Sequence, residues 1–140
     1  MKKFICISIT LFSLISTNSF GQTIDMSADS IATLLCKKWE VNYAMMGNMK
    51  IGRMLGAAEI NYEFNTDKTF LLTSNDPKKK TKGTWMYDTK KKLIKLTVNG
   101  KSNTNIISLK EGELTMLANT KEATPDAPME LILVYKVKTT

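Results

Sequence analysis

Short runs in which apolar and polar residues alternate recur along the chain between residues 38 and 137. In one of them Ile60, Tyr62 and Phe64 alternate with glutamate and asparagine. A period of two is typical of a strand with one buried face and one exposed face. The pattern predicts about eight strands, at residues 38–45, 59–65, 69–74, 83–88, 93–99, 103–109, 114–118 and 131–137.

Turn-forming residues separate these predicted strands at short intervals. Asn99-Gly100 is the strongest hairpin signal, because both residue types accept the left-handed backbone of a two-residue turn. Strands in hairpin order, each with one apolar face, must hide a single curved apolar surface, and closing the sheet also removes its exposed edges. The predicted fold is therefore an all-β, up-and-down antiparallel barrel. A short helix is predicted before it, at residues 27–36, with Ser27 as its N-cap.

The first residues read as a secretory signal peptide. Lys2 and Lys3 precede an apolar run from Phe4 to Ile15, and small residues precede a cleavage point after Gly21. We expect residues 1–21 to be removed, 22–33 to form a tail and the start of the helix, and 34–138 to form the barrel. The apolar run is too short to span a bilayer. The expected mature protein is thus exported, to the periplasm or the outside, and has no transmembrane segment.

The side chains offer little for catalysis. The chain has no histidine, so the commonest general base and metal ligand is missing. The aspartates fall in the tail, the helix or the turns, and no pair of inward carboxylates is evident. Cys36 is the one cysteine beyond the signal peptide, and we predict a buried, reduced thiol. We therefore expect no enzyme activity, no cofactor and no metal site.

Several motifs taken together resemble the small lipocalin-like domains of exported bacterial proteins. They are Leu35-Cys-Lys-Lys-Trp39, Tyr62-Glu-Phe64, Asp67-Lys68 before Thr69-Phe70, Gly83-Thr-Trp85, and Leu131 to Tyr135. The resemblance covers residues 34–138 and departs from the family at Lys37 and Lys68, where the family has glycine. It implies a barrel that the helix closes at one end, with Trp39 packed near that end and Gly83 and Trp85 as structural residues. By analogy with true lipocalins it also implies binding of small apolar molecules, although fold alone does not establish function.

If the protein is a carrier, its ligand enters at the end of the barrel away from the helix. The first strand runs from the helix to that end, and the turns at 75–82, 99–102 and 119–129 share it. The predicted lining is Tyr43, Met45, Met46, Met54, Phe70, Leu72 and Tyr135, with Lys78 or Lys80 near the rim for an acidic headgroup. The alternation does not decide whether Trp85 or Met86 points inward.

Three interpretations of the methionine-rich segment at Met45–Met54 stay open. Thioethers bind soft metals, but no histidine or cysteine stands beside them. Methionine also adapts to varied ligand shapes, which suits a flap over the mouth, and it packs well in ordinary loops. The lysine-rich turns, 78–80 and 90–92, either attract an acidic partner or keep the barrel soluble, and they do not resemble a nucleic-acid site.

Two functions remain. One is a carrier or sensor of a small hydrophobic ligand inside the barrel. The other is a packed, ligand-free barrel that binds a protein or the cell envelope. The amount of free space inside the barrel distinguishes them, because eight strands leave room for side chains or for one small ligand.

Overall fold

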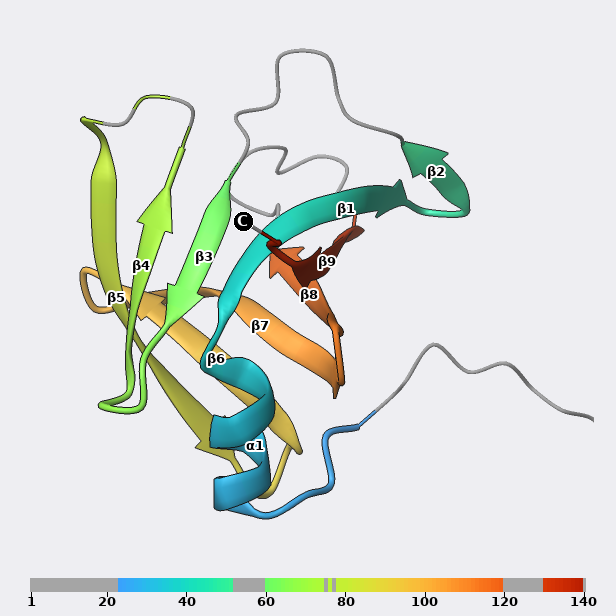
Figure 1. Ribbon diagram of the computed structural model, residues 1–140. Coiled ribbons are helices and arrows are strands. Elements are labelled where there is room, and N and C mark those ends of the chain that lie inside the picture. The colour runs from blue at the N-terminus through green and yellow to red at the C-terminus, as the bar shows by residue number, and fades with distance from the viewer. Residues whose placement is uncertain (1–22, 52–59, 75, 77, 120–129, 140) are drawn as a thin grey trace, which may run out of the picture.

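The computed structural model describes residues 23–51, 60–74, 76, 78–119 and 130–139, and within these it contains one helix and nine strands (Figure 1). The predicted signal peptide and Met54 lie outside these residues. The elements are α1 Ala28–Leu35, β1 Lys38–Met46, β2 Met49–Ile51, β3 Asn61–Phe64, β4 Thr69–Thr73, β5 Lys80–Asp88, β6 Leu93–Val98, β7 Lys101–Lys110, β8 Glu113–Asn119 and β9 Glu130–Val137.

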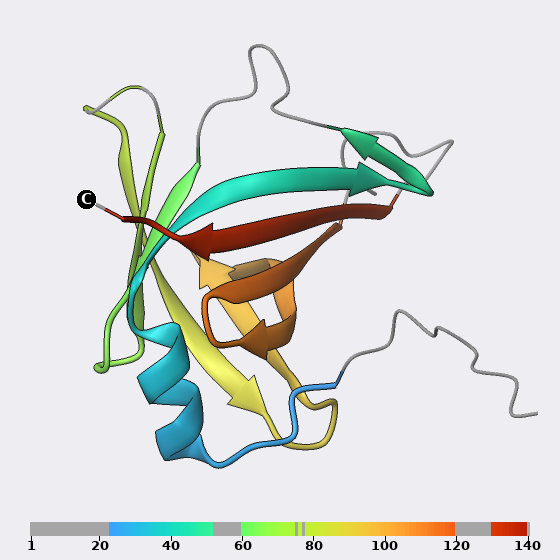
Figure 2. The same ribbon diagram turned by 45° about the vertical axis from the view of Figure 1, so that its right-hand side comes forward.

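The strands form one antiparallel sheet that closes on itself. From β3 to β9 each strand pairs with the next along the chain, and β1 pairs with both β3 and β9. Figure 2 shows β1 and β9 side by side along their length. The predicted up-and-down barrel of eight strands is thus confirmed as β1 with β3 to β9. The short β2, in a segment expected to have no strand, forms a hairpin on the far end of β1.

Helix α1 packs against one end of the barrel (Figure 1). Ser27 is its N-cap as predicted, because the hydroxyl oxygen of Ser27 accepts a hydrogen bond from the backbone N–H of Ser30 at 3.2 Å. Ile31 and Leu35 are buried in the barrel core. The indole N–H of Trp39 donates to the backbone oxygen of Leu35 at 2.9 Å, so this buried side chain also satisfies a carbonyl at the helix end.

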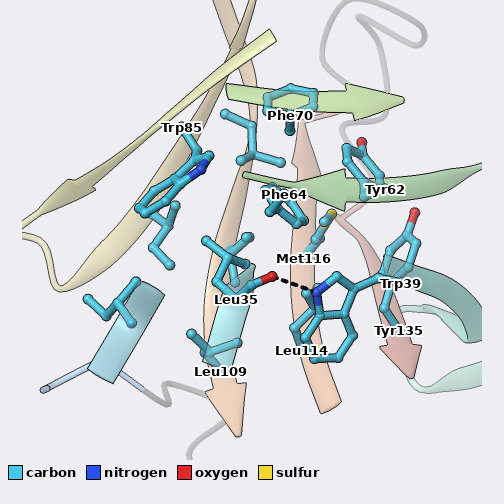
Figure 3. Packing of buried hydrophobic residues seen from close by; sticks show 14 of the residues in the cluster. Leu35, Trp39, Tyr62, Phe64, Phe70, Trp85, Leu109, Leu114, Met116 and Tyr135 are labelled. Carbon is cyan, nitrogen blue, oxygen red and sulfur yellow. Dashed lines mark hydrogen bonds between the residues drawn. The ribbon is translucent and has the colours of Figure 1, made fainter. Parts of the chain in front are cut away.

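Aromatic residues fill much of the barrel interior (Figure 3). The rings of Tyr62 and Phe64 stack at 5.6 Å, and Phe70 packs against both of them. Trp85 points inward with 2% of its surface exposed, whereas Met86 is 61% exposed, which settles the orientation that the sequence left open.

Two turns show how local sequence fits the backbone. Asn99 and Gly100 both have positive φ, 51° and 77°, so the predicted hairpin is present between β6 and β7. Lys68 also has positive φ, 69°, at the position where the related motif has glycine. The ammonium of Lys68 lies 4.0 Å from the centre of the Trp85 ring, and the backbone oxygen of Lys68 accepts a hydrogen bond from the backbone N–H of Trp85. This cation–π contact offsets part of the backbone cost.

A bulge in β1 changes the face on which Tyr43 and Met45, both predicted to line the barrel, are found. Val41 pairs with Tyr135, but Tyr43 pairs with Val134, so β1 has one extra residue between them. Beyond the bulge Ala44 takes the inner side and is 5% exposed. The prediction that Tyr43 and Met45 face inward is therefore wrong.

Candidate ligand-binding cavity

A cavity of about 330 Å³ lies among the inner faces of β3, β4, β6 and β7. Its lining residues are Tyr62, Phe70, Leu96, Val98, Asn99, Lys101 and Thr104. Apolar and polar groups share the walls about equally, and most of the polar groups come from the β6–β7 turn and the start of β7. A lining of this mixed kind suits a small molecule that has both apolar and hydrogen-bonding parts.

The cavity lies toward the end of the barrel away from α1. The backbone N–H of Ile24, just before the helix, donates to the oxygen of Lys92 at 2.8 Å, so β6 begins near the helix end. From there β6 runs to Val98 and the Asn99-Gly100 turn. The cavity therefore lies beside the 99–102 turn, at the end of the barrel where the sequence predicts that a ligand enters.

The pairing of β6 with β7 decides which side chains line the cavity. Leu96 pairs with Thr104 and Val98 pairs with Lys101, so β7 has one more residue than β6 between these pairs. Strict alternation would place Lys101 and Thr104, three residues apart, on opposite faces. The bulge brings both to the cavity, and the small Thr104 leaves space opposite Leu96.

Gly83 in β5 allows the ring of Phe70, which lines the cavity, to pack closely against that strand. An added Cβ at this position would lie 2.3 Å from Cζ of Phe70 and 2.6 Å from the backbone oxygen of Thr97. Only a glycine allows the Phe70 ring to lie this close to β5, so the structural role expected for Gly83 has a direct cause. The position of the Phe70 ring in turn helps to set the shape of the cavity.

Two tyrosines lie at the aromatic side of the cavity. Tyr62 lines it, and the ring of Tyr135 meets Tyr62 edge to face with centroids 5.5 Å apart. Burial raises the pKa of Tyr62 to about 12 and also raises the pKa of Tyr135. Both side chains are therefore uncharged hydrogen-bonding groups over the physiological pH range.

The structure separates the predicted lining residues into several places. Phe70 lines the cavity, Tyr135 lies beside it in the core, and Leu72 is half-buried against the core. Tyr43 and Met45 lie on the outer face of β1, because their partners Val134 and Ile132 alternate with the inward residues of β9. They are therefore not part of this cavity.

The remaining predicted residues do not line the cavity either. Met46 pairs with Leu131 at the far end of β1. Lys78 and Lys80 are exposed at the β4–β5 turn and the start of β5, and neither lines the cavity. Met54 falls outside the described residues.

Sequence reasoning missed Asn99, Lys101 and Thr104, and did not assign Leu96 and Val98 to the site. The alternation in residues 93–99 marks Leu96 and Val98 as inward residues, and this strand ends at the 99–102 turn, at the open end of the barrel. No sequence signal marks the bulge that turns Lys101 and Thr104 toward them.

The described residues include no group of three or more histidine, cysteine, aspartate or glutamate side chains placed to hold a metal ion. Cys36 is half-buried rather than buried, and burial is the main cause of the raised pKa of its thiol. In the described part of the chain, no helix has the length and apolar character needed to cross a membrane.

Comparison with known proteins shows which family the chain matches. The sequence model of a protein family described as a lipocalin-like domain (DUF4923) matches residues 12–123 of the 140. The match includes α1 and β1 to β8 and ends before β9, which closes the barrel. Neither the curated proteins nor the solved structures gave a match.

Proposed function

The chain belongs to the lipocalin-like domain family, and we propose that it is a carrier or sensor that holds one small, mainly apolar molecule in the cavity. The observation that supports this most directly is the space beside Tyr62, Phe70 and Leu96, next to the buried core of the barrel. Eight-stranded barrels have room for their own side chains or for one small ligand, and this cavity favours the ligand.

The volume indicates how much of a ligand the cavity can hold. About 330 Å³ is at the lower end of the range for small-molecule sites. At about 30 Å³ for each water-sized group, it holds roughly eleven non-hydrogen atoms. A compact aromatic or branched molecule fits within this limit, whereas a long fatty acid would extend out of the cavity.

The proposal also includes where and how the protein acts. The signal-peptide pattern of residues 1–21 supports an exported carrier, outside the cytoplasm. The absence of histidine from the sequence supports reversible binding rather than a reaction.

The test is an NMR titration of the protein with a panel of small aromatic and branched compounds of up to about a dozen non-hydrogen atoms. We expect saturable shifts of the amides of Val98, Asn99 and Lys101. Thr104→Trp fills the cavity and should abolish these shifts. Thr84→Trp is the matched control, because Thr84 is exposed on β5 and its pairing partner Thr69 lies outside the cavity.

If no compound in the panel binds saturably, the carrier proposal fails. That result would favour the other function, a packed barrel that binds a macromolecule. Binding that is equal in wild type, Thr104→Trp and Thr84→Trp would place a ligand elsewhere and would also contradict the proposal.

A further inference from the structure

The lining of the cavity changes from buried and apolar to exposed and polar. Tyr62, Phe70 and Leu96 are buried, and the two rings belong to the aromatic cluster of the core (Figure 3). Asn99 and Lys101 line the cavity too, but both are exposed, in the β6–β7 turn and at the first residue of β7. One side of the cavity is therefore apolar, and the side at the turn combines contact with water and a cation.

Lys101 is the charged residue of this lining. Among the described residues that line the cavity, none is an aspartate or a glutamate. The ion pairs between described residues involve other lysines, at positions Lys38, Lys92, Lys95 and Lys136. Within the described part of the chain, no carboxylate therefore competes with a ligand for the Lys101 ammonium.

The length of the lysine side chain lets this ammonium meet a molecule in the cavity. A lysine lays its long, flexible stem along apolar surface and keeps its charge at the water boundary. Lys101 pairs with Val98 across the hairpin, so its stem begins beside an apolar residue of the lining. A molecule that lies against Phe70 and extends toward the turn brings its outer end to the ammonium.

Other charges at this end of the barrel have the same sign. The β4–β5 turn and the start of β5 contain the exposed lysines 78–80, and Asp76 is the described acidic residue of that turn. Lys82 is exposed in β5, two residues before Thr84, which pairs with Thr97 near the end of β6. Lysines gathered around an opening attract anions and repel cations before contact.

We propose that the ligand is a compact aromatic or branched molecule with one anionic group, in the simplest case a carboxylate, which the Lys101 ammonium binds at the mouth of the cavity. The inference rests on the proposed function and specifies the chemical class of its ligand. The apolar body lies against Phe70 and Leu96, and the side-chain amide of Asn99 can donate a further hydrogen bond to the anionic group.

The experiment compares three probes of about ten non-hydrogen atoms each, which suit the cavity volume. They are 4-methylbenzoate, 4-methylbenzamide, which replaces the carboxylate with a neutral group of the same size, and 4-methylbenzylammonium, which has the opposite charge. Each is titrated into wild type, Lys101→Met, Lys101→Arg and Lys82→Met, with dissociation constants from NMR shifts. Lys82→Met is the matched control, because it removes one exposed lysine from the same end of the barrel and does not change the lining.

We expect wild type to bind the benzoate at least about threefold more tightly than the benzamide, and the ammonium probe most weakly. Lys101→Met should weaken benzoate binding about three- to fivefold, as expected for one ion pair that water still reaches, and leave benzamide binding unchanged. Lys101→Arg should keep the preference for the benzoate, and added salt should reduce it in wild type. Lys82→Met should weaken benzoate binding by less than about 1.5-fold.

Equal binding of the benzoate and the benzamide, or a preference for the benzoate that Lys101→Met leaves intact, would overturn this inference and leave the carrier function standing. Tightest binding of the ammonium probe would overturn it as well. Equal losses in Lys101→Met and Lys82→Met would show that the overall charge of this end, rather than Lys101, selects the anion. If none of the three probes binds, the inference fails, and the wider panel with Thr104→Trp decides the carrier function separately.

Discussion

Replacement of Gly83 by alanine tests the packing that defines the cavity wall. The added Cβ would lie 2.3 and 2.6 Å from two ring carbons of Phe70 and 2.6 Å from the backbone oxygen of Thr97. Ordinary contacts are about 3.5–4.0 Å, so the ring would have to move by roughly 1 Å. Phe70 is buried and packed against Tyr62 and Phe64 at 5.6 Å, so it has little room to do so.

We therefore expect Gly83→Ala to lower the free energy of unfolding by about 2–3 kcal/mol, the upper part of the range for overpacked cores. For a domain of this size that corresponds to a fall of roughly 8–12 °C in melting temperature. The assay is urea and thermal unfolding followed by circular dichroism. Thr84→Ala, at the next and exposed position of β5, is the control and should cost less than about 1 kcal/mol.

A double-mutant cycle identifies the cause of the loss. In a Phe70→Leu background the smaller side chain removes the ring clash but leaves the contact with the Thr97 oxygen. Gly83→Ala should then cost about 1 kcal/mol less than it does beside Phe70. Equal costs in both backgrounds, or a Gly83→Ala variant as stable as wild type, would refute this description of the wall.

Three further predictions concern the helix end, acid stability and the thiol. Trp39→Ala should lower the free energy of unfolding by about 3–5 kcal/mol, because it leaves a cavity in the core and removes the hydrogen-bond donor to the Leu35 carbonyl. An unchanged melting temperature would show that the register of β1 is wrong. Asp88 accepts hydrogen bonds from two backbone N–H groups and pairs with Lys95 at 3.1 Å, which holds the pKa of its carboxyl below the ordinary 3.8. The stability that these contacts give is present above pH 3.8 and is lost as the pH falls through the lower folded-state pKa, so Asp88→Asn should make the urea midpoint vary less between about pH 5 and pH 2. The same pH dependence in Asp88→Asn and wild type would argue against this role. Cys36 has a raised pKa and is half-buried, so iodoacetamide should label it more slowly in the native protein than in urea, and equal rates would contradict its packing against the core.

The strand pattern was predictable because alternation and turn chemistry are local. Tyr62 and Phe64 alternate with polar residues, and the structure buries both. Asn99-Gly100 carries its own turn geometry, and the hairpin is present. The N-cap at Ser27 is equally local, since it depends on a hydroxyl three residues before an N–H group.

Sequence reasoning predicted a wrong face where one residue is inserted into a strand, and gave no answer where two neighbouring side chains are equally apolar. The bulge after Val41 adds one residue to β1 and reverses the faces of Tyr43 and Met45 without any change in composition. The sequence could not choose between Trp85 and Met86, because both are large and apolar. The cavity itself is what remains after side chains such as Phe70 have packed, so its lining depends on contacts between distant segments.

Intermolecular NOEs between a bound compound of the small aromatic and branched panel and methyl groups of the protein test the central claim most directly. The account predicts contacts from the probe to the methyl groups of Leu96 and Val98, which line the cavity, and loss of these contacts in Thr104→Trp. Ile132, on the outer face beside Met45, provides the internal comparison. Contacts to Ile132 in place of Leu96 and Val98 would show that the ligand binds outside the barrel and would contradict the account.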